Sequence, residues 1–193
     1  LGLLRLADRS RGGNFLDRIP QIRNKIATDI GMVLPTVRVR DNLELDPDEY
    51  RVKLSEMVVA TGKTNSSTEL ANRLYETIEK HSAEILNRDA TQFLLEQVRQ
   101  KHPVVVEEIV NHKVTLAEIQ QTLQLLLRER LPIRQMTLIL ESLGDVAELE
   151  KNPVLRTEFV RRRMARTITD RHKGIDGELS VIQFDSDLTE SIH

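Results

Sequence analysis

The sequence predicts an α+β protein that is predominantly α-helical, and three observations lead to this prediction. Apolar residues recur at spacings of three and four over most of the chain from 63 to 172, as they do on buried helix faces. Alternating apolar and polar residues between 36 and 60 indicate short strands, and a second alternating run follows Gly177. We therefore expect three parts: a small α/β subdomain at 1–62, a helical region at 63–172, and the beginning of a further α/β subdomain at 173–193.

The first predicted helix runs from Asn14 to Gly31. Asn14 belongs to the residue types that cap free amide groups at a helix start, and Asp17 lies in the first turn, where negative charge is favourable. One side of the helix is expected to be buried, because its apolar residues are three or four positions apart. These apolar residues are Phe15, Ile19, Ile22, Ile26 and Ile30.

Short strands are predicted next. Pro35 ends the helical pattern, and the alternation of apolar and basic residues at 36–40 is typical of a half-exposed strand. Residues 50–54 alternate as well, and 57–60 are expected to add a third strand. The Asn and Pro residues at 41–50 favour turns, which is compatible with either hairpin-like or parallel pairing of the first two strands.

The polar, glycine-containing segment at 61–67 is predicted to be a linker, and the chain beyond it to be helical. Ser66 and Glu69 fit a capping box that opens the first of these helices. A second helix is expected at 89–101, and Pro103 suits the first turn of a third. The residues of the second helix that we expect to be buried are Phe93, Leu94 and Val98.

Three more helices complete the predicted bundle. Thr115 and Glu118 form another capping box, Pro132 is expected to open the next helix until Gly144 stops it, and a last helix is expected at 152–168. Short connections between these helices favour antiparallel packing. The expected inward-facing residues of the first two are Leu116, Ile119, Leu123, Leu126, Leu127, Ile133, Met136, Ile139, Leu140 and Leu143.

The two ends of the chain are expected to lie inside a longer protein. Leu1 is not an initiator methionine and begins directly in an apolar stretch. After Gly177, the apolar residues Val181, Ile182 and Phe184 predict a strand that leads into a further α/β unit. The chain stops too soon to complete that unit.

The composition indicates a water-soluble chain that does not cross a membrane. Charged residues make up 30% of the 193 residues, and no signal-peptide pattern opens the chain. No apolar run approaches the roughly 20 residues that span a bilayer. The absence of cysteine excludes disulfides and is compatible with a reducing compartment. A net charge of −2 and an aromatic content of 3% argue against nucleic acid as a partner.

No active site, cofactor site or metal site is evident in the sequence. Gly62, Lys63 and Thr64 resemble the end of a phosphate-binding loop, but the position five residues before Gly62, which must be glycine, is Met57. The histidines lack the spacing of four at which two imidazoles share a metal, and they lie on different predicted elements. These histidines are His81, His102, His112 and His172. We therefore expect a protein that binds other proteins and is not an enzyme.

Charge is unevenly distributed along the chain. Residues 41–50 contain five acids and no base, whereas 151–171 contain seven bases and two acids. This separation suits a subunit that assembles, although two ordinary solvated faces would also produce it. The arginines at 161–163 and 166 lie late in a predicted helix, where they either offset the helix dipole or contact an acidic surface of a neighbour.

Two strings in the first part of the chain, FLDRIPQIRNKI and VRVRDNLELDPDEY, form an unusually specific pair of motifs. They resemble motifs in the cytoplasmic domain of the FHIPEP family of export gates, and the resemblance extends over nearly the whole chain. The likeness resumes at TELANRLYETIEKH, at LLRERLPIRQMTLILESL, where Gln135 replaces a usual aspartate, and at ELSVIQFDSDLTESI. One departure is large, because the family usually carries dozens of further residues between the Tyr50 strand and the Glu69 helix.

The resemblance implies a role that composition and spacing do not. Family members are export gates of flagella or of type III secretion injectisomes, with a membrane region and cytoplasmic domains that form a homo-oligomeric ring. That ring receives complexes of chaperones with export substrates and works with export ATPase components. Part of its docking surface is attributed to the cleft beside the stretch that is short here, which weakens the case for client binding by this chain.

We expect this chain to be the cytoplasmic part of a flagellar gate, at the cytoplasmic face of the bacterial inner membrane, with no cofactor and no nucleic acid partner. An injectisome gate, or an unrelated helical interaction module, is the alternative. The candidate protein-interaction residues are Arg40, Asp41, Asn42, Arg134, Arg161, Arg162 and Arg163.

Overall fold

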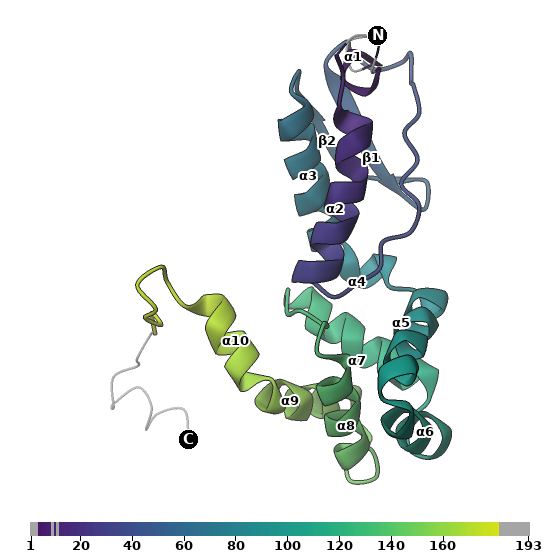
Figure 1. The fold of residues 1–193 in the computed structure, drawn as a ribbon, viewed down its shortest axis with the longest axis vertical. Coiled ribbons are helices and arrows are strands. Elements are labelled where there is room, and N and C mark those ends of the chain that lie inside the picture. Colours follow the sequence, from purple (N-terminus) through teal and green to yellow (C-terminus); the bar gives the residue numbers. More distant parts are fainter. Residues whose placement is uncertain (1–3, 9, 11, 182–193) are drawn as a thin grey trace.

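The computed structural model describes residues 4–8, 10 and 12–181, and it shows a mostly helical chain with one two-stranded sheet (Figure 1). The predicted α+β class, predominantly helical, is confirmed. The hairpin lies against the α2 and α3 end of the molecule, and helices α4 to α9 form the other end (Figure 1). The elements are α1 Leu4–Ala7, α2 Phe15–Asp29, β1 Glu49–Leu54, β2 Met57–Lys63, α3 Ser67–Lys80, α4 Ser82–Ile85, α5 Arg88–Lys101, α6 Pro103–His112, α7 Leu116–Arg128, α8 Met136–Val146, α9 Pro153–Arg163 and α10 Ala165–His172.

Helix α2 lies where its apolar spacing predicts, with Phe15, Ile22 and Ile26 buried. The predicted cap is wrong: the Asn14 side chain makes no capping hydrogen bond and instead accepts one from Arg18 Nε at 3.2 Å. The helix ends before Gly31, which has a φ of +88°. A Cβ at Gly31 would lie 2.3 Å from the backbone nitrogen of Arg134, in the segment between α7 and α8. Both the positive φ and this close approach require glycine.

The sheet is an antiparallel hairpin. Glu49 pairs with Lys63 at its open end and Leu54 with Met57 beside the turn, where Ser55 and Glu56 both have positive φ. Two such residues are what a tight turn needs to match the twist of the strands. The expected strand at 36–40 is wrong, because β1 and β2 pair with each other and this segment is irregular. The expected linker at 61–67 is also wrong in its first part, which belongs to β2.

One of the two predicted capping boxes is complete, the other is half formed because the Glu69 carboxylate accepts from the Thr64 hydroxyl at 2.7 Å, and two long helices are divided. The backbone amide of Glu69 donates to the Ser66 hydroxyl, and Thr115 with Glu118 forms a complete capping box. The helix expected from Ser66 breaks at His81 into α3 and α4, and the last one breaks at Met164 into α9 and α10. Both breaks turn the chain so that each piece packs on a different neighbour, which periodicity cannot reveal.

Helix α8 also differs from its expected limits. It begins at Met136 rather than at Pro132, because the preceding residues form an irregular segment in which the Ile133 amide donates to the Ile30 carbonyl at 2.7 Å. It continues past Gly144, which lies inside the helix. A Cβ there would lie only 3.0 Å from Ile109 Cγ1 of α6, so glycine allows α6 and α8 to approach closely and does not act as a stop.

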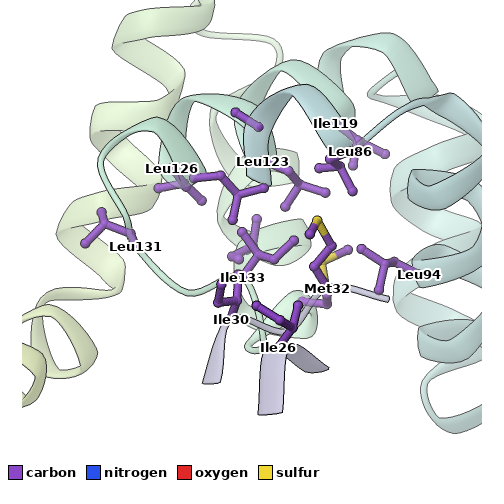
Figure 2. Close-up of a cluster of buried hydrophobic side chains, with 14 of the residues drawn as sticks. Ile26, Ile30, Met32, Leu86, Leu94, Ile119, Leu123, Leu126, Leu131 and Ile133 are labelled. Carbon is purple, nitrogen blue, oxygen red and sulfur yellow. The ribbon is translucent and has the colours of Figure 1, made fainter. Parts of the chain in front are cut away.

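One hydrophobic core connects the two ends of the molecule. Ile26 and Met32, from the end of α2 and the segment after it, pack against Leu123 and Leu126 of α7 and against Ile133 (Figure 2). All five side chains are 0% exposed. Most predicted inward residues are buried, but Phe93 is 48% exposed, so its predicted burial is wrong. The strand expected near Val181 lies largely outside the described residues, and 179–181 are irregular.

Candidate protein-interaction surface

The acid-rich segment at 41–50 forms an exposed loop fixed against the open end of the hairpin. The Thr64 amide donates to the Asp48 carbonyl at 2.9 Å, and the Glu49 amide donates to the Asp46 carbonyl at 3.0 Å. Lys63 Nζ lies 2.7 Å from Asp46 Oδ2, and this hydrogen bond lowers the pKa of the Asp46 carboxyl. The loop is therefore held in place while most of its carboxylates point to solvent.

Three carboxylates of this loop have no cationic partner among the described residues. Glu49 pairs with Arg51 at 3.2 Å and Asp46 with Lys63, but Asp41, Glu44 and Asp48 have no ion pair there and are exposed. Leu43, which lies between the first two of these acids, is 81% exposed. The loop therefore presents free carboxylates and one apolar side chain to the solvent.

The base-rich segment at 151–171 is less available than its composition suggests. Arg161 pairs with Glu158 at 3.1 Å, and Arg171 pairs with Glu79 of α3 at 2.9 Å. Arg162 also pairs with Glu158, but its Nε lies 3.8 Å from the carboxylate oxygen. Its side chain is 78% exposed. Arg163 is exposed as well, so these two residues remain the accessible part of the cluster.

Arg156 belongs to the base-rich segment in sequence, but its side chain is buried. Its side chain is 3% exposed, and it binds the carbonyls of Ala147 and Glu150 and the Glu118 carboxylate, whose Oε1 lies 2.6 Å from Nη1. Arg156 thus ties the end of α8 to the start of α7 from inside the molecule. It contributes to packing and not to any surface.

Glu118 is held in its ionised form by this arrangement. The Thr115 backbone amide donates to its Oε2 at 2.8 Å, as does the Thr115 hydroxyl, and Arg156 binds the other oxygen. These contacts, with the backbone hydrogen bond as the largest cause, lower the pKa of Glu118 from 4.5 to about 2, and burial opposes them. The N-terminus of α7 is therefore fixed by a charge that resists acid.

The other predicted interaction residues lie apart from the arginine cluster. Arg40, Asp41 and Asn42 are exposed on the loop after the α2 turn, and the Asn42 side chain accepts the Glu44 amide at 3.0 Å. Arg134 is exposed beside Gly31, in the segment that joins α7 to α8. The structure does not gather the seven predicted residues into one patch, and their role stays a prediction.

A groove along α7 was missed by the sequence reasoning. It has a volume of about 310 Å³ and is lined by Arg88 at the start of α5 and by the outward side of α7, from Ala117 to Arg128. The lining contains three glutamines, Gln120, Gln121 and Gln124, and no acid. Spacing alone reveals an outward polar stripe on α7, but only the fold places Arg88 beside it.

Two further findings bear on the type of site. In the described part of the chain, no three His, Cys, Asp or Glu side chains lie close enough together to hold a metal ion. Among the described helices, none has the length and apolar content required to span a membrane.

Comparisons with known proteins identify relatives of the chain. The FHIPEP family model matches residues 1–71 and 63–193. The flagellar biosynthesis protein FlhA of Helicobacter pylori strain J99 is 31% identical over 236 aligned positions, which cover 96% of this chain and 32% of that protein. The chain thus spans about a third of this curated relative. Because the alignment is longer than the 193 residues here, the relative has residues without counterpart in this chain.

Solved structures share the fold. The CdsV protein of Chlamydia pneumoniae has a TM-score of 0.82 at 23% identity, covering 95% of this chain and 68% of that one, and CdsV has also been solved with CdsO. SctV-C of EPEC, solved as a nonamer, has a TM-score of 0.74 at 17% identity, covering 93% and 76%. The match of the family model to the chain from end to end, supported by this fold, shows that the chain belongs to the FHIPEP family.

Proposed function

We propose that this chain is a cytoplasmic part of the export gate of a flagellar type III protein export apparatus. The observation that carries the proposal is the match of the family model from end to end. We favour the flagellar system over an injectisome because the curated relative FlhA is a flagellar biosynthesis protein. The injectisome proteins among the solved structures are below 25% identity, so their names do not decide between the two systems.

Within that apparatus, the chain acts as a subunit of a homo-oligomeric ring at the cytoplasmic face of the bacterial inner membrane. Support comes from the nonameric state of the structural relative SctV-C. Separate acidic and basic surfaces on one subunit also support it, because they allow a head-to-tail contact between identical copies. Such exposed charges mainly set the orientation and the association rate of the subunits, so salt weakens ring formation moderately.

The ring serves as a docking platform for export substrates, their chaperones and export ATPase components. The complex of the structural relative CdsV with CdsO supports the binding of a protein partner. The stretch that FlhA has and this chain lacks is expected to contribute to client docking. We therefore expect this chain to bind chaperone–substrate complexes more weakly than FlhA does, which a side-by-side titration of both proteins with one such complex measures.

The ring proposal is tested in the full-length parent protein by replacing Arg162 and Arg163 with Glu. Light scattering measures ring formation, and export of flagellar subunits into the medium measures function, at low and physiological salt. We expect the parent to form rings. Both readouts fall in the variant if α9 supplies the basic surface of the contact, and they stay unchanged if another basic surface supplies it. A parent that stays monomeric at all protein concentrations and still exports its substrates would refute the ring proposal.

The role is one of binding, without catalysis. Gly62 and Lys63 lie inside β2, where Gly62 faces the Tyr50 ring and Lys63 pairs with Asp46, an arrangement that leaves no loop to wrap a phosphate. We expect no saturable ATP binding in a calorimetric titration and no phosphatase or esterase turnover. Saturable ATP binding that the Lys63→Ala variant loses would contradict this expectation and favour an enzyme.

A further inference from the structure

We propose that the groove along α7 binds the acidic loop at 41–50 of a second copy of this chain. This inference rests on the proposed ring and names the two surfaces that meet in it. It also chooses between two arginine-containing surfaces, because the arginines of α9 are the alternative partner for the same loop.

The groove carries positive charge that nothing in the described part of the chain neutralises. Arg88 and Arg128 both lie on its lining and are exposed, and neither has an ion pair among the described residues. Glu129, the acid next to Arg128 in sequence, is already bound by Arg161 Nη1 at 3.5 Å. Two unpaired arginines in a depression without acids form a site for carboxylates.

The groove is also held in shape before a ligand arrives. Gln120 Nε2 donates to the Leu86 carbonyl at 2.9 Å, and its Oε1 accepts a hydrogen bond from Arg88 Nε at 3.0 Å. Gln124 Nε2 donates to the carbonyls of Ala83 and Leu86, each at 3.0 Å. These contacts fix the glutamines and orient the Arg88 guanidinium, which reduces the entropy that ligand binding would otherwise remove.

The acidic loop complements this groove in charge and in apolar content. Asp41 and Glu44 are unpaired carboxylates on either side of the exposed Leu43. The groove likewise places its two arginines at the ends of a surface that includes the half-buried Leu125. Since Arg88 is bonded to Gln120, the two cations are separated along α7 by about eight residues, or roughly 12 Å.

The two surfaces cannot serve each other within one copy. The loop is anchored beside the end of β2, at the hairpin end of the molecule, and α7 lies at the bundle end (Figure 1). A contact between them therefore joins one copy to the next, with different surfaces used on each side. Such a heterologous contact repeats around a ring when its rotation closes.

The first test is binding of a fluorescent peptide with the sequence of residues 41–50 to the chain, measured by anisotropy. Replacing Arg88 and Arg128 with Gln should weaken binding about tenfold, as expected for the loss of two solvent-exposed ion pairs. The matched control replaces Arg162 and Arg163 with Gln and should leave the affinity unchanged. A peptide with its five acids changed to the corresponding amides should not bind.

Equal peptide binding by the wild-type chain and the Arg88→Gln/Arg128→Gln variant would overturn the proposal. Binding lost only in the Arg162→Gln/Arg163→Gln variant would assign the loop to α9 instead. Circular dichroism and the urea midpoint of each variant establish that it is folded.

A charge reversal in the full-length parent separates this proposal from the ring itself. Arg88→Glu with Arg128→Glu should abolish assembly, and adding Asp41→Lys with Glu44→Lys should restore it in light scattering. Rings that form unchanged with the reversed groove would refute this contact and leave the ring proposal standing. A parent that never forms rings while the peptide still binds the groove would refute the ring alone.

Discussion

The helical bundle around α7 and the β1–β2 hairpin are stabilised in different ways. In the bundle, Ile119, Leu123 and Leu126 of α7 are 0% exposed. In the hairpin, no residue of either strand is buried, and Met57 is 66% exposed. A two-stranded sheet has no hydrophobic layer of its own. The hairpin therefore depends on contacts through partly buried residues such as Tyr50 and Val52, whereas the bundle has its own core.

The polar contacts of the bundle are also more buried than those of the hairpin end. The bundle contains an arginine, Arg156, that is almost fully buried and bound by two carbonyls and a carboxylate. The hairpin end relies on the Lys63–Asp46 pair, in which both side chains are about two-thirds exposed at 66% and 64%. A buried polar group without its partner is expensive, whereas an exposed pair is replaced by water. The comparison indicates that most of the folding stability comes from the bundle. Residues on the loop surfaces can therefore be replaced at little cost in stability.

The largest effect is expected from Leu126→Ala, which should lower the free energy of unfolding by about 2–5 kcal/mol because it leaves a cavity in the core. The matched change in the hairpin, Met57→Ala, should shift it by less than about 0.5 kcal/mol. Urea unfolding followed by circular dichroism measures both. Similar shifts for the two variants would contradict the contrast between the regions.

A smaller effect is expected from Arg156→Met. This change should lower the free energy of unfolding by about 2–4 kcal/mol, because two carbonyls and Glu118 lose a buried partner. Methionine keeps much of the apolar stem, so the loss reflects the charge and its hydrogen bonds. Lys63→Ala, the control from the hairpin end, should leave the urea midpoint unchanged. An Arg156→Met variant as stable as the wild type would show that this buried network adds nothing.

The smallest expected effect is on the stability of the fold at low pH. Folding lowers the pKa of Glu118 from 4.5 to about 2, so its ionised form stabilises the fold above pH 4.5, and that contribution is lost as the pH falls toward 2. The effect is reduced because 36% of the side chain is exposed to screening solvent. In Glu118→Gln, the urea midpoint should fall less steeply over this pH range than in the wild type. Parallel curves for the two proteins would exclude Glu118 as a source of acid sensitivity.

Much of the fold could be predicted from sequence because its signals are local. The capping box of Thr115 and Glu118 spans four consecutive residues, and the apolar stripe of α7 repeats every three or four residues. Both are complete within one or two helical turns, so they need no knowledge of neighbours. The antiparallel β1–β2 hairpin is not among the expected pairings, which concerned 36–40 with 50–54, because strand pairing joins residues that the sequence does not relate. The missing partner for 36–40 could not be foreseen for the same reason.

The candidate site was less predictable, since it depends on which charges remain unpaired. The sequence determined that acids concentrate at 41–50 and bases at 151–171, and it carried the family motifs. Only the tertiary structure decided that Arg156 is buried against Glu118, which is 38 positions away, and that Arg88 lies beside Gln120, 32 positions away. The sequence fixes where charged residues stand along the chain. Whether a charged side chain is exposed and unpaired depends on long-range contacts, which form only when the helices pack.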